Sequence, residues 1–170
     1  EIPIIDGSSS PFVDIIEKNG VLEQDAAKVW YTIDTNISYF DDVKKVEMTA
    51  LPSVNYQLTT LIDFNSPVLG TQHASLKSMK EFKTEIAPCR TFVFLRELEA
   101  LLQHNLIKGG DLDNAIVLVD SELPKEKLDY LRKVFNKPDV EVKGRGVLNN
   151  TKLHFYNEPA RHKLLDIVGD

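Results

Sequence analysis

The residues best suited to chemistry lie close together in one segment, 157 to 170. His162, Asp166 and Asp170 recur there at every fourth position. A helix turns by about 100° per residue, so it would present all three on one stripe and the intervening apolar residues on the other side. Imidazole nitrogen and carboxylate oxygen both bind Zn²⁺, and the four-residue spacing lets two side chains converge on one ion. The pattern indicates a helix that could hold a metal ion and add a second carboxylate to orient a catalytic base.

A simpler interpretation explains the same spacing. A solvated helix face with a His–Asp pair would contribute only a few tenths of a kcal/mol. A catalytic zinc site also needs three protein ligands and an open position, whereas this helix supplies two. Spacing alone favours the solvated face.

The elements that would position this helix follow from periodicity and turn residues. We expect an α+β architecture, because alternating strands come early and helices are interleaved later, unlike a regular parallel sheet. The expected elements are a strand at 1–6, a helix from Ser8–Pro11 to Asn19–Gly20, antiparallel strands between Val29 and about Phe64, a helix capped by Ser78 and Glu81 and ending near Pro88, an extended segment at 90–92, a helix to Asn105, a strand at 115–119, a helix at 124–135, a strand at 148–156 and a last helix after Asn157. The best domain boundary lies at 20–24.

Composition limits the class of protein. The chain has 170 residues, of which 42% are hydrophobic and 27% charged, and its formal charge is −6, so it lacks the basic footprint of a nucleic-acid binder. No apolar stretch is long enough to span a bilayer, and we expect a soluble protein. Cys89 is the one cysteine and no secretory leader is evident, which favours a cytoplasmic location. Because the chain begins with Glu1 and stops within a helical pattern, we expect it to be an excerpt of a longer protein.

Several motifs together resemble one family, the UDP-3-O-acyl-N-acetylglucosamine deacetylases of lipid A and lipopolysaccharide biosynthesis. The motifs are Arg-His-Lys-x-x-Asp-x-x-Gly-Asp at 161–170, Cys-Arg-Thr-Phe-Val-Phe at 89–94 with Cys89 in place of an alanine, Gly109-Gly110, the opening segment 1–12, the turn at 62–67 and Asp-Asn-Ala-Ile-Val at 113–117. The resemblance is closest to versions from the Bacteroides group. In some relatives of that type the enzyme is fused to a downstream hydroxyacyl carrier protein dehydratase.

The resemblance implies a role for each matching residue. His162 and Asp166 would ligate zinc, Asp170 would pair with a catalytic histidine located downstream, and Thr91 would help to hold a tetrahedral oxyanion. The residues implied in substrate binding are Phe92, Lys163 and Gly110, together with Leu98, Ile107, Ala115 and Val117 along an apolar passage for the acyl chain. Without the resemblance, Thr91 would be taken as a strand-end hydroxyl and the apolar residues as core.

The implied reaction is metal-assisted amide hydrolysis, in which a carboxylate base takes the proton of the attacking water. The family's Glu-His dipeptide, which supplies that base and the third ligand, is absent, and we expect His73, His104 and His154 to be structural or surface residues. The resemblance also implies two-layer α/β sandwich domains. Residues 1–22 would finish the first domain with a strand and a helix, and 23–170 would form most of the second, with an insertion at about 120–148.

Two other functions stay open. The chain could be a non-catalytic fragment that binds a nucleotide sugar or a protein, or an unrelated metal hydrolase with the same helix. The oligomeric state and the preferred acyl length do not follow from the sequence.

Overall fold

A computed structural model describes residues 2–104, 111–141 and 144–169 of the chain. They contain helices together with three small sheets, which confirms the expected α+β class. The helices are α1 (Ser10–Asn19), α2 (Leu95–Gln103), α3 (Lys125–Val134) and α4 (Glu158–Gly169), and the strands are β1 (Ile37–Asp41), β2 (Val46–Ala50), β3 (Leu58–Asp63), β4 (Thr71–Leu76), β5 (Phe92–Phe94), β6 (Ile116–Val119) and β7 (Gly146–Val147). Shorter helical turns are η1 (Met79–Glu81), η2 (Phe82–Ile86) and η3 (Leu148–Asn150).

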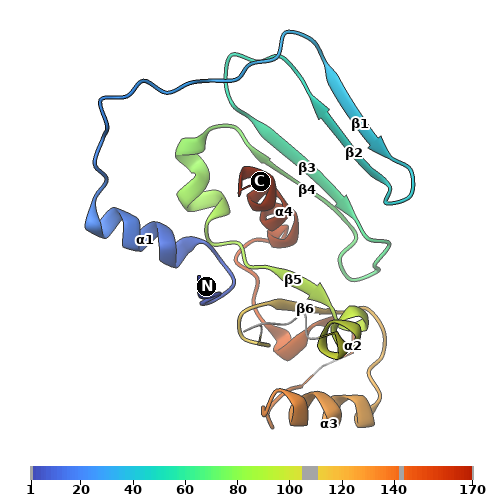
Figure 1. Cartoon of the computed structure of the whole chain (residues 1–170). Coiled ribbons are helices and arrows are strands. Elements are labelled where there is room, and N and C mark those ends of the chain that lie inside the picture. The colour runs from blue at the N-terminus through green and yellow to red at the C-terminus, as the bar shows by residue number, and fades with distance from the viewer. Residues whose placement is uncertain (1, 105–110, 142–143, 170) are drawn as a thin grey trace.

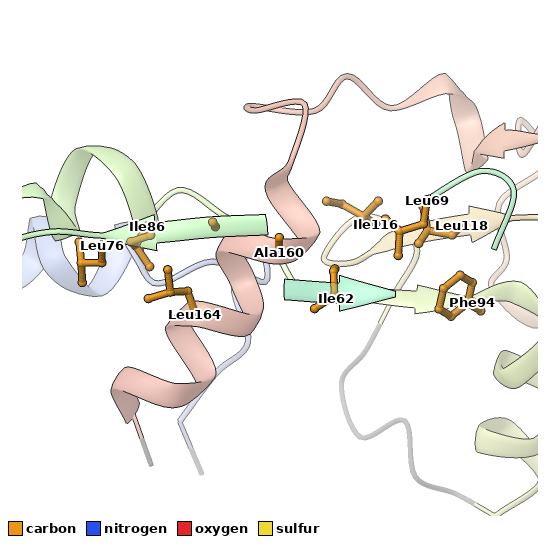
Figure 2. Close-up of a cluster of buried hydrophobic side chains, with 10 residues drawn as sticks. Ile62, Leu69, Leu76, Ile86, Phe94, Ile116, Leu118, Ala160 and Leu164 are labelled. Carbon is orange, nitrogen blue, oxygen red and sulfur yellow. The ribbon is translucent and has the colours of Figure 1, made fainter. Parts of the chain in front are cut away.

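The last helix, α4, packs against the antiparallel hairpin β3–β4 (Figure 1). Ala160 and Leu164 are fully buried, and they belong to a cluster that also holds Ile62 and Leu76 of the hairpin (Figure 2). Because residues four apart share one face of a helix, burying this stripe leaves the stripe that carries His162 and Asp166 on a different side. The core thus fixes which way the candidate ligands face.

A second sheet lies next to this cluster, with β5 parallel to β6 and β6 antiparallel to β7. Successive side chains of a strand point to opposite faces. Accordingly, Phe94 and Ile116 pack into the cluster beneath α4, whereas Val117 and Val119 pack into a second cluster beneath α2 and α3. The short strand β5 therefore carries residues toward α4 on one face only.

The expected insertion contributes to this second cluster. Helix α3 buries Leu131 completely, and Val140 of the following segment is also fully buried. The segment that contains α3 and Val140 is thus part of a hydrophobic core rather than a solvated loop.

The N-terminal part of the chain contains one helix, a long irregular segment and a hairpin. Helix α1 begins with Ser10 and Pro11 and ends at Gly20, as predicted. Residues 20–36 form no helix or strand and lead to the hairpin β1–β2, whose strands pair from Ile37 with Ala50 to Asp41 with Val46 (Figure 1).

Antiparallel strands form between 29 and 64 as expected, but they begin later than predicted, and two other expected strands are wrong. Residues 2–6 form no strand, and Ile2 is 81% exposed, because no neighbouring strand among the described residues pairs with this segment. The segment 29–32 is likewise irregular, and the strands begin at Ile37 instead. The expected strand at 148–156 is replaced by the turn η3, in which Asn149 adopts a φ of 56°, followed by irregular chain. The left-handed conformation of Asn149 lies outside the β region, so the chain is not extended there.

The helix predicted after Ser78 forms with a different geometry. The Ser78 hydroxyl accepts a hydrogen bond from the Lys80 amide at 3.3 Å, as an N-cap should. The helix then continues as one turn of 3₁₀-helix and one of π-helix to Ile86. In the described part of the chain, no helix has the length and apolar character needed to cross a membrane.

Candidate active site

Helix α4 presents the two candidate metal ligands side by side. His162 Nε2 lies 3.6 Å from Asp166 Oδ1, and His162 Nδ1 lies 3.0 Å from the carbonyl oxygen of Cys89. A carbonyl oxygen only accepts hydrogen bonds, so Nδ1 carries the proton and donates it to Cys89. Nε2, the nitrogen facing Asp166, is then the atom with a free lone pair.

The distance between His162 Nε2 and Asp166 Oδ1 fits a zinc ion bound by both atoms. Two ligands each about 2.0–2.2 Å from a tetrahedral zinc ion lie roughly 3.3–3.6 Å apart. The separation of 3.6 Å between His162 Nε2 and Asp166 Oδ1 agrees with that spacing. Metal-bound histidines usually donate their other ring N–H to a carbonyl or carboxylate, which is the role of the Cys89 carbonyl here.

The ligand set is incomplete within the part of the chain that the structure describes. No group of three His, Cys, Asp or Glu side chains gathers there in a way that could hold a metal ion. Asp170, the proposed partner of a catalytic histidine, lies outside the described residues. A third ligand would have to approach Nε2 of His162 and the carboxylate of Asp166, whose side chain is 41% exposed.

Lys163 lies next to Asp166, and both side chains are partly exposed. Its ammonium donates to Asp166 Oδ2 at 2.9 Å and lies 5.6 Å from the centre of the Phe92 ring. A positive charge over an aromatic face is attracted by the ring quadrupole. The structure thereby brings together three residues that the sequence assigned to metal or substrate, namely Phe92, Lys163 and Asp166.

Thr91 is held by its backbone from two directions. Its amide donates to the Gly7 carbonyl at 2.9 Å, and its carbonyl accepts from the Ile116 amide of β6 at 2.8 Å. Since Cys89, two residues earlier, contacts His162, the half-buried Thr91 lies on the segment that borders the candidate ligands.

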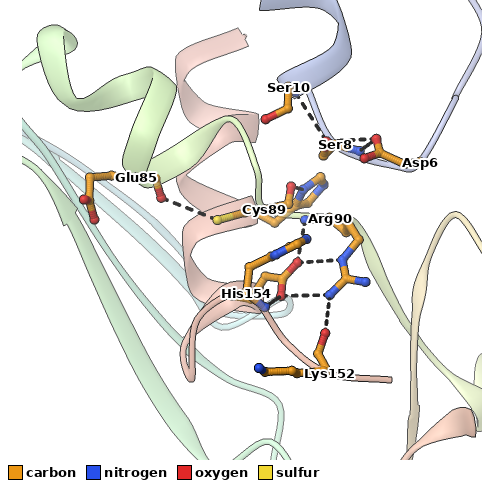
Figure 3. Close-up of polar contacts among 10 residues, drawn as sticks. Asp6, Ser8, Ser10, Glu85, Cys89, Arg90, Lys152 and His154 are labelled. Atoms are coloured by element: carbon orange, nitrogen blue, oxygen red, sulfur yellow. Dashed lines mark hydrogen bonds and ion pairs between the residues drawn. The ribbon is translucent and has the colours of Figure 1, made fainter. Parts of the chain in front are cut away.

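Gly7 lies very close to the backbone of Asn114. It has a φ of +79°, and a Cβ built on it would lie 1.9 Å from the carbonyl oxygen of Asn114. A side chain is therefore excluded where the opening segment crosses the start of β6. Figure 3 shows the neighbouring residues Asp6 and Ser8 next to Cys89 and Arg90, with Asp6 Oδ1 accepting from the Ser8 hydroxyl at 2.8 Å.

Arg90 and Glu158 form an ion pair one helical turn before His162. The Glu158 carboxylate is fully buried and accepts from Arg90 Nε at 2.9 Å and Nη2 at 3.1 Å. Burial alone would raise the pKa of Glu158, but the hydrogen bonds from the Arg90 side chain and from the Arg90 and His154 amides outweigh it, so the pKa is lowered. The hydrogen bond to Glu158 raises the pKa of Arg90 in turn. Sequence reasoning missed this pair, although Glu158 precedes His162 by one helical turn.

The Cys89 thiol is not suited to act as a nucleophile. Burial, together with the nearby Glu158 charge, raises the pKa of the thiol to about 12. A nucleophilic cysteine requires a thiolate, which such a pKa disfavours at neutral pH. The contribution of Cys89 to the site is its backbone carbonyl.

Phe64 is a further residue that the sequence did not single out. It follows β3 and packs edge-on against Phe92, with 5.7 Å between ring centres, and against Phe94 at 5.5 Å. It lies in the turn 62–67 that carried part of the family resemblance, which was the available signal. Phe64 is 39% exposed and extends the apolar surface beside Lys163.

The residues assigned to the acyl passage are placed differently. Leu98 and Val117 are 4% and 2% exposed and belong to the second hydrophobic cluster, on the face of β5–β6 opposite Phe94. Ala115 is half-buried and directly precedes Ile116, whose amide binds Thr91. Ile107 and Gly110 lie outside the described residues. The structure thus gathers the polar and aromatic part of the predicted site but not its apolar part.

One side of α4 thus brings together an imidazole, a carboxylate and an ammonium group, from His162, Asp166 and Lys163. A sequence model of the family described as UDP-3-O-acyl N-acetylglycosamine deacetylase matches residues 1–136. The chain belongs to this family.

Similar proteins carry two kinds of name. The chain is 45% identical to the bifunctional enzyme LpxC/FabZ of Chlorobaculum tepidum and 43% identical to that of Bacteroides thetaiotaomicron, in each case over 100% of the chain and 37% of the relative. It is 36% identical to the UDP-3-O-acyl-N-acetylglucosamine deacetylase of Syntrophotalea carbinolica, over 100% of the chain and 47% of the relative. The chain thus spans between about a third and a half of the length of these relatives.

Proposed function

We propose that the polypeptide containing this chain hydrolyses the N-acetyl group of UDP-3-O-(3-hydroxyacyl)-N-acetylglucosamine with the help of zinc, the committed step of lipid A biosynthesis. The observation that carries the proposal is the convergence of His162 Nε2 and Asp166 Oδ1 at 3.6 Å, with Nδ1 fixed by the Cys89 carbonyl. Membership of the deacetylase family supplies the reaction and the substrate.

His162 and Asp166 would hold the zinc ion. When bound, zinc supplies Lewis acidity, which makes an amide carbonyl more electrophilic. The Thr91 hydroxyl would donate a hydrogen bond to the acetyl oxygen as negative charge develops on it. Because its backbone is tied to Gly7 and Ile116, this donor is held in place before the reaction begins.

Lys163 and Phe92 would bind the substrate. The ammonium group suits an anionic phosphate or a sugar oxygen, and its bond to the Asp166 carboxylate would be exchanged when the metal and the substrate arrive. A passage for the acyl chain along Leu98, Ile107, Gly110, Ala115 and Val117 is also proposed, and it would require the second cluster, which buries Leu98 and Val117, to open for the chain. We place the third ligand, the glutamate base and the catalytic histidine in other parts of the longer polypeptide, and we assign to Asp170 the role of pairing with that histidine.

The wider organisation is also part of the proposal. Residues 1–22 would complete one domain and 23–170 would form most of a second, a division supported by the irregular segment 20–36. Relatives named bifunctional enzyme LpxC/FabZ support a polypeptide that carries a second activity. Substrate chemistry and the single, thiol-form cysteine support action in the cytoplasm.

The test is acetate release by the full-length protein from the acylated UDP-sugar. We expect turnover that is lost after chelation and restored by added zinc. As matched controls, the same sugar without its acyl chain and an unrelated N-acetyl amide should react poorly. Equal activity on the unrelated amide would point instead to a different metal hydrolase, and the absence of turnover with zinc restored would favour a binding protein.

A further inference from the structure

We propose that the buried Arg90–Glu158 pair is a positioning device, which sets the Thr91 hydroxyl at a fixed place relative to the His162 imidazole. The inference rests on the proposed function and deepens it. It assigns a role in the reaction to two residues that touch neither metal nor substrate.

The first step is the register between α4 and the segment before β5. Glu158 and His162 are four residues apart and therefore lie on one face of the helix. Glu158 binds Arg90, and His162 binds the carbonyl of the preceding residue, Cys89, at 3.0 Å. Two successive residues of the segment are thus tied to two successive turns of the same helix face.

The second step is the completeness of the contact. Both oxygens of Glu158 are used: Oε1 accepts from the Arg90 amide at 3.0 Å and from Nε at 2.9 Å, and Oε2 accepts from Arg90 Nη2 at 3.1 Å and from the His154 amide at 2.6 Å. Arg90 Nη2 also donates to the Lys152 carbonyl at 2.9 Å, which Figure 3 shows below the Arg90 side chain. The carboxylate therefore fixes both the backbone and the side chain of Arg90.

The third step is energetic. A buried ion pair contributes little net stability compared with apolar packing, because desolvation offsets the attraction. The paired hydrogen bonds from the planar Arg90 guanidinium to the two Glu158 oxygens instead specify one geometry. A lysine ammonium cannot form this pair of bonds. The side chains of Arg90 and Glu158 are 15% and 0% exposed, so water has little access to the Glu158 carboxylate.

The fourth step connects this geometry to Thr91. Its own amide and carbonyl are bound to Gly7 and Ile116, so the residue is held from the far side while Arg90 holds it from the α4 side. Loss of this pair of bonds would let residues 89–91 shift along α4. An error of about 1 Å in a catalytic donor can cost about 100-fold in rate.

The experiment uses the full-length protein with zinc restored and compares Arg90→Lys, Glu158→Gln and a control, Lys83→Gln. Lys83 forms exposed ion pairs with Asp14 and Glu17 and has no proposed role in the site. Its replacement should therefore leave turnover unchanged. For Arg90→Lys and Glu158→Gln we expect kcat to fall by about 10- to 100-fold, with KM and the zinc content of folded protein within about twofold of the unaltered enzyme.

The readouts separate positioning from simple stability. A lower unfolding temperature with unchanged kcat per folded molecule would overturn the proposal, and so would loss of zinc at saturating metal. If Glu158→Gln does not accumulate as folded protein, Arg90→Lys, which keeps the buried positive charge, decides alone. If the unaltered enzyme releases no acetate, the proposed function fails and the positioning role fails with it, whereas an active enzyme with fully active variants removes only the positioning role.

Discussion

At the scale of single residues, the site depends on which nitrogen of His162 faces Asp166. The Cys89 carbonyl binds Nδ1, so Nε2 remains to face the carboxylate at 3.6 Å. A backbone carbonyl can only accept a hydrogen bond, so in the neutral imidazole the proton is on Nδ1. Second contacts of this kind orient a metal ligand and raise its basicity.

Asp166→Ala in the full-length enzyme should remove one of two neighbouring ligands. We expect zinc affinity to fall by at least about 100-fold and turnover to be lost, because one coordinating oxygen disappears from a site with few ligands. Zinc per folded chain, measured after dialysis against a weak chelator, checks this, with Asp129→Ala on the surface of α3 as the control. Unchanged zinc content in Asp166→Ala would remove this residue from the ligand set.

Glu158 should make the protein sensitive to acid. Its pKa is lowered in the folded state from an ordinary value of 4.5, so the unfolded chain takes up the proton more readily. The stabilisation is present above that ordinary pKa and is lost as the pH falls through the lower, folded value. We expect the free energy of unfolding to decline more steeply between about pH 5 and pH 3 in the unaltered protein than in Glu158→Gln.

At pH 7 the same variant should be less stable by about 2–4 kcal/mol, since Arg90 would keep its charge without an ionised partner. Denaturant unfolding at a series of pH values measures both effects. Parallel pH curves for the two proteins would contradict the ionised, buried state of Glu158.

Residue types and spacing predicted part of this site. The four-residue period predicted that His162 and Asp166 share one side of a helix, whereas their roles as ligands, like the roles of Thr91, Phe92 and Lys163, followed only from family motifs. The Cys89 carbonyl could not be predicted, because a backbone group has no sequence signature. Glu158 could not be predicted either, since its partner Arg90 is distant in the chain and only the fold brings them together.

At the scale of elements, the opening segment acts as a brace for the start of β5. The Gly7 carbonyl accepts from Thr91, and Ser9 and Ser10 donate their amides to the Ala87 carbonyl at 3.0 Å. Helix α1 is thereby attached on one side of the segment that α4 holds on the other.

Gly7→Ala should loosen this brace. The new methyl group would meet the Asn114 carbonyl, and alanine is also strained at positive φ, so we expect a loss of about 2–4 kcal/mol and lower activity. Gly20→Ala is the matched control, because Gly20 has a similar φ of +80° but nothing within 4 Å of an added Cβ, and it should cost only about 1 kcal/mol. Chemical denaturation of both variants makes the comparison, and equal losses would mean that the close approach of Gly7 is unimportant.

The insertion helix α3 should be required for stability. Leu131→Ala should cost about 2–5 kcal/mol because the side chain is fully buried in the second cluster. Val134→Ala on the same helix, where the side chain is 41% exposed, should change stability by less than about 1 kcal/mol. Similar unfolding midpoints for the two variants would show that α3 does not dock as described.

The helices were easier to predict than the strands. α1 has Pro11 in its first turn and Gly20 directly after its end, and α3 and α4 each bury apolar residues; all three form within a few residues of the predicted positions. The segments at 2–6, 29–32 and 148–156 have strand-like composition but no ladder partner in the described chain. A strand depends on its neighbours for hydrogen bonds, so a local pattern predicts it less securely than a helix.

At the scale of the whole molecule, the core and the site share one helix. α4 buries Ala160 and Leu164 against β3–β4, and from another side it presents His162 to the segment before β5, with Asp166 next to His162. The expected α+β class is confirmed, and the family follows from the match over residues 1–136. The chain covers 37% of two of its bifunctional relatives, so the rest of the ligand set is proposed to lie elsewhere in the longer protein.

The most direct test of this account is a crystal structure of the full-length protein with zinc, in which anomalous scattering locates the metal. We predict one zinc ion within about 2.0–2.2 Å of both His162 Nε2 and an Asp166 carboxylate oxygen, with Nδ1 still bound to the Cys89 carbonyl. A zinc ion bound through Nδ1, or located away from α4, would contradict the proposed site.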